Sequence, residues 1–170
     1  MSASTSLLSD AFGRIGEGVA MVVDGLSPHE LAHRVAPRAN TIAWLVWHLT
    51  RVQDGHIAEL IDGAEQVYVT GDWGPRFGLA SDPDDSGYGH SAAEVASVRP
   101  TDGDALLDYL DAVTAVTEGY LRGVSAEDLD SVVDRNWDPP VTLGVRLVSV
   151  ADDCLEHAGQ ANYVRGLVGG

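Results

Sequence analysis

The sequence of 170 residues predicts an all-α protein. We expect a four-helix bundle, formed by one domain over residues 1–170, with a long crossover loop between the second and third helices. Apolar residues recur three and four positions apart in four long segments, which is the spacing of one buried helix face. No run of alternating apolar and polar residues competes with these segments. With 45% hydrophobic residues the chain can bury a sizeable core, which excludes an intrinsically disordered protein.

The first two helices are expected over residues 4–24 and 41–61. In each, leucine, isoleucine and valine side chains line one helix face, and polar residues precede the first apolar position. A serine, threonine or asparagine at that place accepts a hydrogen bond from a free backbone amide, whereas glycine ends a helix. The expected cap and stop residues are Ser4 or Thr5, Gly25 and Asn40.

The third and fourth helices are expected over residues 102–122 and 143–168. Acidic residues open the third helix, where the helix dipole favours negative charge. Thr142 follows two prolines and is placed to cap the fourth helix, which Gly169 and Gly170 are expected to stop.

The link over residues 62–101 differs in kind from the other connections. It is far longer than the roughly 2–8 residues that usually join neighbouring bundle helices. Aromatic residues within it, Trp73, Phe77 and Tyr88, offer apolar anchors that disordered segments lack. We therefore expect an ordered crossover that lies over one end of the bundle.

The charge balance excludes several classes of partner. Ten arginines and no lysine stand against 26 acidic residues, which gives a formal net charge of −16. Nucleic acids and anionic membrane surfaces bind basic patches, so neither is an expected partner. A single cysteine, Cys154, excludes an internal disulfide and fits a reducing compartment. The amino-terminal segment lacks a basic region and no apolar run is long enough to span a bilayer, so we expect a cytoplasmic protein.

Two histidines lie in the middle of predicted helices beside the apolar stripes. His48 is flanked by leucine and valine one turn away, so it is expected to point inward. Asp153 and His157 are four residues apart, which places both on one helix face. Such a pair, with a third ligand from a facing helix, can bind one Zn²⁺ and leave a coordination position open. A surface ion pair and a hydrogen-bonded core histidine remain the alternatives.

These segments resemble the DinB-like superfamily of metal-binding four-helix bundles. The resemblance lies in Asn40–Leu49 and Asp153–Gln160, and it extends over the whole chain in helix order and loop length. In many members the last helix reads His-x-x-x-His-Arg-Gly-Gln, whereas this chain has Asp153 at the first histidine and Ala158 at the arginine. A carboxylate at the first position is typical of the branch that includes mycothiol-dependent maleylpyruvate isomerase. The mycobacterial mycothiol S-transferase-like members are the most similar.

The resemblance implies a DinB-like four-helix bundle in which His48, Asp153 and His157 bind Zn²⁺, with another divalent metal such as Ni²⁺ as the alternative. It further implies a transferase that conjugates mycothiol, as a cosubstrate, to small electrophiles through a metal-bound thiolate. The expected partners are a small-molecule thiol and an electrophile, and the expected state is a monomer or homodimer. An isomerase of the maleylpyruvate type is a second hypothesis. It is disfavoured because that enzyme carries a further C-terminal domain and this chain ends at Gly170. A non-catalytic metal-binding stress protein is a third.

Four further residues are candidates for substrate binding: Trp73, Arg76, Arg146 and Gln160. The first two can line the thiol pocket from the long loop or simply hold that loop on the bundle. Arg146 lies seven residues before Asp153 on the same helix face, where it can meet an anionic substrate or remain solvated. Gln160 can border the site or pack between helices.

The remaining cysteine and histidines have simpler interpretations. Cys154 turns about 100° away from Asp153 and is expected in the core. His56 is an alternative metal ligand in a wetter setting. His29, His33 and His90 lie in polar links and are expected to be exposed.

Overall fold

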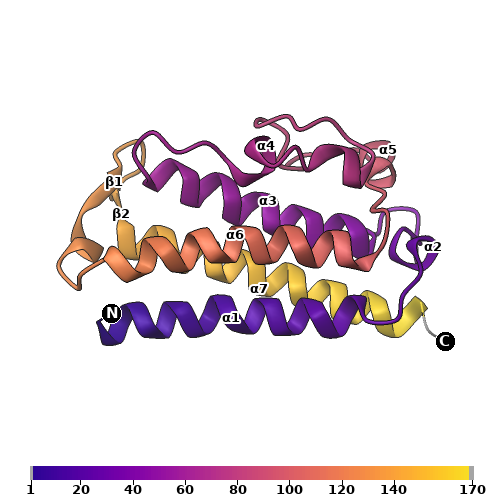
Figure 1. Ribbon diagram of the computed structural model, residues 1–170, viewed down its shortest axis with the longest axis horizontal. Coiled ribbons are helices and arrows are strands. Elements are labelled where there is room, and N and C mark those ends of the chain that lie inside the picture. Colours follow the sequence, from indigo (N-terminus) through magenta and orange to yellow (C-terminus); the bar gives the residue numbers. More distant parts are fainter. Residues whose placement is uncertain (1, 169–170) are drawn as a thin grey trace.

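The computed structural model describes residues 2–168, and four long helices dominate it (Figure 1). They are α1 (Ala3–Val23), α3 (Ile42–Leu60), α6 (Gly103–Gly123) and α7 (Leu143–Val168). Each begins and ends within about one residue of the range predicted from the sequence. Helices α6 and α7 both pack against α1 and α3, so that the four surround one core. The predicted all-α four-helix bundle is confirmed.

The helix caps differ in position from those expected, although the capping chemistry is the same. Ser2, rather than Ser4 or Thr5, caps α1 through the amide of Thr5, and Thr41, rather than Asn40, accepts a hydrogen bond from the amide of Trp44. In both cases the capping residue is the last one with extended backbone before the helix.

The other expected end signals lie close to their predicted places. At α7, the hydroxyl of Thr142 lies 3.4 Å from the amide of Val145, as expected of a cap. Gly25 follows α1 with a φ of +71°. The predicted stop at Gly169 and Gly170 lies outside the described residues.

The direction of the helices explains the length of the 62–101 link. In Figure 1, α3 and α6 run in the same direction, antiparallel to α1 and α7. The chain must therefore return along the whole length of α3 before α6 can begin. The expectation that the link covers one end of the bundle is wrong for this reason. On its way the crossover forms α4 (Val67–Thr70), the 3-10 helix η1 (Gly74–Phe77) and α5 (Ala92–Ser97).

The remaining elements are short. Helix α2 (Pro28–Leu31) joins α1 to α3, and the 3-10 helix η2 (Asp128–Asp130) follows α6. Two strands, β1 (Val132–Asp134) and β2 (Val141–Thr142), form an antiparallel hairpin before α7, with Val132 opposite Thr142. These strands are too short to show an alternating pattern, which is why the sequence did not predict them.

Helix α3 is the most deeply buried of the four. Every residue from Ile42 to Arg51 is buried, because α6, α7 and the crossover together cover this half of the helix. A polar side chain in this stretch must find partners inside the protein. Among residues 2–168, no helix is long and apolar enough to cross a membrane.

Trp73 and Arg76 hold the crossover against α6. The Trp73 ring is half-buried, and its centroid lies 5.3 Å from that of the Tyr109 ring. The guanidinium carbon of Arg76 lies 4.9 Å from the centroid of the Trp73 ring. Arg76 also forms a 2.8 Å ion pair with Asp108 on α6. These contacts favour the anchoring role over the substrate-binding one.

We expect Trp73→Ala to destabilise the protein without a selective effect on substrate binding. Removing a half-buried tryptophan costs about 2 kcal/mol, which in a chain of this length lowers the melting temperature by roughly 5 °C. Calorimetry and saturation curves on the same variant measure both effects. An unchanged melting temperature with a raised KM for the thiol would contradict the anchoring role.

Candidate metal site and adjoining groove

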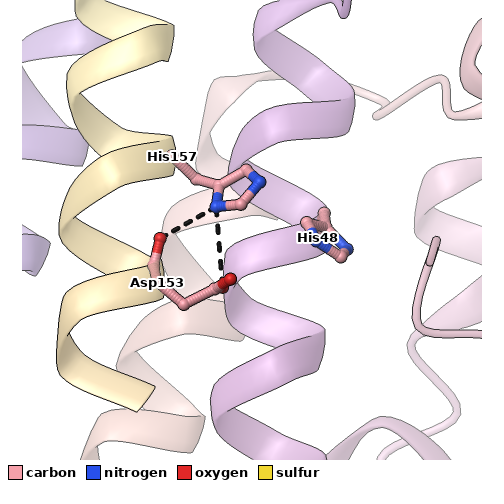
Figure 2. Close-up of side chains that lie close together, drawn as sticks. All are labelled: His48, Asp153 and His157. Carbon is pink, nitrogen blue, oxygen red and sulfur yellow. Dashed lines mark hydrogen bonds and ion pairs between the residues drawn. The ribbon is translucent and has the colours of Figure 1, made fainter. Parts of the chain in front are cut away.

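Three polar side chains from facing helices meet between α3 and α7. Figure 2 shows His48 on α3 close to Asp153 and His157 on α7. One ligand atom from each of the three residues lies within 4.8 Å of the others. The imidazole rings of the two histidines meet edge to face, with centroids 4.8 Å apart. The structure therefore brings together the three residues singled out as metal ligands.

The hydrogen bonds of the two histidines determine which ring nitrogen is free. Nδ1 of His48 lies 2.5 Å from the carbonyl oxygen of Ser86, and Nδ1 of His157 lies 2.8 Å from the carbonyl oxygen of Asp153. A carbonyl only accepts hydrogen bonds, so each Nδ1 carries the proton and donates it. In the neutral rings the lone pair is consequently on Nε2, the arrangement found when a second partner orients a metal-binding histidine.

The Asp153 carboxylate is the least satisfied group of the cluster. Its Oδ2 is buried and has no hydrogen-bond partner among residues 2–168, since Nδ1 of His157 lies 3.5 Å away and is bonded to the main chain. A buried carboxylate oxygen without a partner is costly unless a cation neutralises it. Two neutral imidazoles and one carboxylate are donors that suit Zn²⁺ and other first-row divalent metals. The residues present thus fit a divalent cation.

The surroundings of His48 keep its imidazole neutral. Burial lowers the pKa of His48 below its ordinary value, although the carbonyl of Ser86 opposes this shift. The indole of Trp44 stacks on the imidazole at a centroid distance of 4.5 Å. A neutral ring in a dry setting is the form that coordinates a metal.

A buried arginine holds the loop that orients His48. The Arg51 side chain is 1% exposed, and its guanidinium donates to the carbonyl oxygens of Asp82, Pro83 and Asp85 at 3.0–3.2 Å. The next residue of the loop is Ser86, whose carbonyl accepts from His48. Arg51 therefore fixes the backbone from which the metal-site histidine receives its orientation.

Asp54 completes this buried network on the other side of Arg51. Its carboxylate lies 3.5 Å from the guanidinium, accepts from the amides of Val67 and Tyr68 at 2.8 Å, and accepts from the Tyr109 hydroxyl at 2.7 Å. Helix α4 is thereby held against α3 and α6. Burial raises the pKa of Tyr109 well above its ordinary value, so this hydroxyl stays protonated as a donor.

His90 is not exposed as the sequence suggested, because the crossover folds it back onto α3. Its side chain is 12% exposed and stacks on Trp47. Its Nε2 donates to Asp85 at 2.8 Å, and its Nδ1 accepts from the indole N–H of Trp44 at 3.1 Å. His90 thus links the loop to the tryptophan that stacks on His48. His29 and His33 are exposed, as predicted.

Gly87 lets the loop approach the His48 ring closely. Its φ is +88°, and a Cβ atom there would lie 3.0 Å from Nδ1 of His48 and 2.8 Å from the Trp47 ring. Real side chains almost never make such short contacts, so any larger residue must push the loop or the imidazole away.

We expect Gly87→Ala to weaken metal binding, with Gly89→Ala as the matched control. Gly89 also has a positive φ, +76°, but, its chain neighbours aside, no atom of residues 2–168 lies within 4 Å of its Cβ position. Both variants carry the backbone cost of about 1–2 kcal/mol, and only the first displaces Ser86 and His48. Metal titrations should show roughly tenfold lower affinity for Gly87→Ala alone. Equal affinities in the two variants would contradict the close-approach argument.

Arg51 and Ser86 were missed as site residues by sequence reasoning. A signal for Arg51 exists, because an arginine in a helix that is apolar on all sides must be buried and paired. Ser86 contributes only its backbone carbonyl, which leaves no mark in the sequence.

The remaining candidates lie around the cluster in different settings. Cys154 is fully buried, as predicted, and its Sγ lies 3.4 Å from the carbonyl oxygen of Leu49. His56 faces Arg146 and Glu59 and is not part of the three-residue cluster. Gln160 is exposed and borders a separate shallow hollow with Asn40 and Tyr163.

Arg146 lies in a groove that adjoins the cluster. The groove, about 500 Å³ in volume, is bounded by α3, α7 and the hairpin, and Asp153 belongs both to its lining and to the cluster. Arg146 forms a 3.0 Å ion pair with Asp134 of the hairpin. Trp73 and Arg76 are absent from the residues that line this groove in the described chain.

Fold and site together define a four-helix bundle with a two-histidine, one-carboxylate cluster between facing helices, the architecture of the DinB-like proteins. A family model described as mycothiol-S-transferase matches residues 7–170, and the chain belongs to this family. A search of curated proteins gives no match.

A solved structure shares the fold of this chain. The chain is similar to a conserved protein from Enterococcus faecalis, with a TM-score of 0.89 and 35% sequence identity. The similarity covers 99% of this chain and 98% of the other, so it extends over the bundle and the crossover alike.

Proposed function

We propose that this protein is a zinc-dependent S-transferase that conjugates a low-molecular-weight thiol, mycothiol, to small electrophiles. The observation that carries the proposal is the cluster of His48, Asp153 and His157 in a chain of the mycothiol-S-transferase family. We further propose these three residues as the metal ligands.

The donor set supports a catalytic rather than a purely structural ion. Three protein ligands leave at least one coordination position for an outside ligand, whereas structural zinc sites are normally closed by four. A zinc ion bound there would lower the pKa of a coordinating thiol, so that thiolate is present at neutral pH. Asp153 supplies the one negative charge of the cluster, and the two imidazoles are neutral donors.

The protein's own thiol is unsuited to the role of nucleophile, which favours a small-molecule thiol. Burial raises the pKa of Cys154 far above its ordinary value, and its Sγ points to the Leu49 carbonyl on α3. A protonated thiol enclosed in the core neither attacks an electrophile nor reaches solvent. The reacting sulfur must therefore arrive with a substrate.

The chain's remaining contribution is to orient the ligands and to shield His48 from water. The Ser86 carbonyl holds the His48 ring, the Asp153 carbonyl holds the His157 ring, and Trp44 covers one face of His48. A preorganised and partly dry site strengthens the electrostatic interactions within it.

Replacing His157 by Ala is expected to abolish both metal retention and thiol transfer. Alanine favours helices, so α7 should persist and the loss should reflect the missing ligand. Metal content by mass spectrometry and thiol conjugation to 1-chloro-2,4-dinitrobenzene are the two measurements. His33→Ala, which removes an exposed histidine, is the control and should retain both. Full metal content in His157→Ala would refute the assignment.

Cys154→Ala should leave metal content and thiol transfer at the level of the unchanged protein. Loss of a small buried side chain should cost only about 1 kcal/mol of stability. The same two assays, together with a melting curve, test this outcome. A folded Cys154→Ala variant without transferase activity would show that the sulfur in the core takes part in the reaction.

A further inference from the structure

We infer that the groove between α3, α7 and the hairpin binds the uncharged, hydroxyl-bearing body of the thiol cosubstrate. This inference rests on the proposed function, in which the sulfur of the thiol cosubstrate reaches the cluster. It assigns a binding place to the rest of that cosubstrate. The groove shares Asp153 with the cluster, so a ligand lying in it can extend its sulfur to the metal-binding residues without crossing protein.

The lining of the groove is apolar along its walls and polar at defined points. Valine side chains from α3, β2 and α7 form the walls: Val52, Val141, Val145 and Val150. Polar groups converge from His56, Asp134, Arg146 and Ser149. Apolar walls with a few convergent donors and acceptors are typical of small-molecule sites.

The charge of the groove disfavours an anionic ligand. The Arg146 side chain is 17% exposed, and its guanidinium already lies 3.0 Å from the Asp134 carboxylate and 3.5 Å from that of Glu59. The amide of Asn136 and then Arg146 lower the pKa of Asp134, which keeps its charge. An anion entering here must compete with two carboxylates for one cation. Hydroxyl or amide groups need no net charge and can hydrogen-bond to Arg146, Asp134 and Ser149.

These contacts change the expected role of Arg146. The sequence suggested that it meets an anionic substrate, whereas in the structure it ties the hairpin to α7 and α3. Its guanidinium Nη1 also lies 2.8 Å from Nδ1 of His56. Arg146 therefore shapes the groove and offers it hydrogen-bond donors.

Trp137 supplies an aromatic wall at the mouth of the groove. It lies in the turn of the hairpin and is 67% exposed, although tryptophan is usually well buried. Its flat apolar face can pack on the C–H face of a hydroxylated ring that lies in the groove.

Filling the groove tests the inference. Val145 and Val148 are both exposed on α7, at 53% and 58%, but only Val145 belongs to the groove lining. We expect Val145→Trp to raise the KM for mycothiol at least tenfold and to raise that for 2-mercaptoethanol, which has no body to accommodate, much less. Metal content and melting temperature should stay unchanged. Val148→Trp is the matched control and should leave all four unchanged.

A second pair of variants tests the aromatic wall. Trp137→Ala should raise the KM for mycothiol about tenfold, whereas Tyr163→Ala, which removes a 72% exposed aromatic ring elsewhere on α7, should not. Neither ring is buried, so neither change should prevent folding. A mycothiol KM that Val145→Trp and Trp137→Ala both leave unchanged would overturn the inference.

Binding without turnover separates this inference from the proposed function. S-methyl mycothiol has a blocked sulfur, and its titration into metal-free protein can be followed by NMR shifts of the groove residues. Shifts at Val141 and Ser149 that are lost in Val145→Trp support the groove even if no thiol is conjugated. In that case the transferase proposal alone fails. Conjugation of mycothiol without these shifts would refute the groove alone.

The expected ligand chemistry is tested with two simple thiols. The transferase should use 1-thio-β-D-glucose, which is uncharged and hydroxyl-rich, with a kcat/KM at least tenfold above that for the dianionic mercaptosuccinate. A preference for mercaptosuccinate would overturn the assignment of an uncharged ligand.

Discussion

The buried guanidinium of Arg51 holds the crossover against α3, and the orientation of His48 follows from that contact. A charge in the interior is tolerated only when paired and hydrogen-bonded. Here the Asp54 carboxylate and the backbone carbonyls of Asp82, Pro83 and Asp85 meet that need. The same bonds draw the crossover onto α3. Because the buried guanidinium needs hydrogen-bond acceptors, it positions this loop of the crossover. The loop in turn orients His48 through the carbonyl of Ser86.

The parallel course of α3 and α6 makes such an anchor necessary. A chain that must return along the bundle exposes a long segment of backbone whose polar groups need partners. Asp54 satisfies amides at the start of α4, and Arg51 satisfies carbonyls further along. The crossover is therefore ordered by a few buried charges on α3 together with the aromatic contacts of Trp73.

The metal cluster and the groove divide the work of the site between them. The cluster is held by hydrogen bonds to backbone carbonyls, and it contains the unsatisfied carboxylate oxygen of Asp153. The groove is open, and the charge of Arg146 within it is already balanced by carboxylates. Under the proposed function, reactivity and recognition would rest on separate residues that meet at Asp153, so the substrate body could vary without disturbing the ligands.

The four helices and the shared helix face of Asp153 and His157 follow from spacing along the chain, whereas His48 was joined to them through the resemblance to the DinB-like superfamily. Helical periodicity is a local property, and the separation of Asp153 and His157 by four residues places them on one face wherever the helix lies. Only the tertiary structure decided the path of the crossover, the hairpin with Trp137, and the burial of His90. These features depend on which helices run parallel and on backbone groups such as the Ser86 carbonyl. Because every residue has the same backbone carbonyl, the sequence does not indicate which one accepts a hydrogen bond.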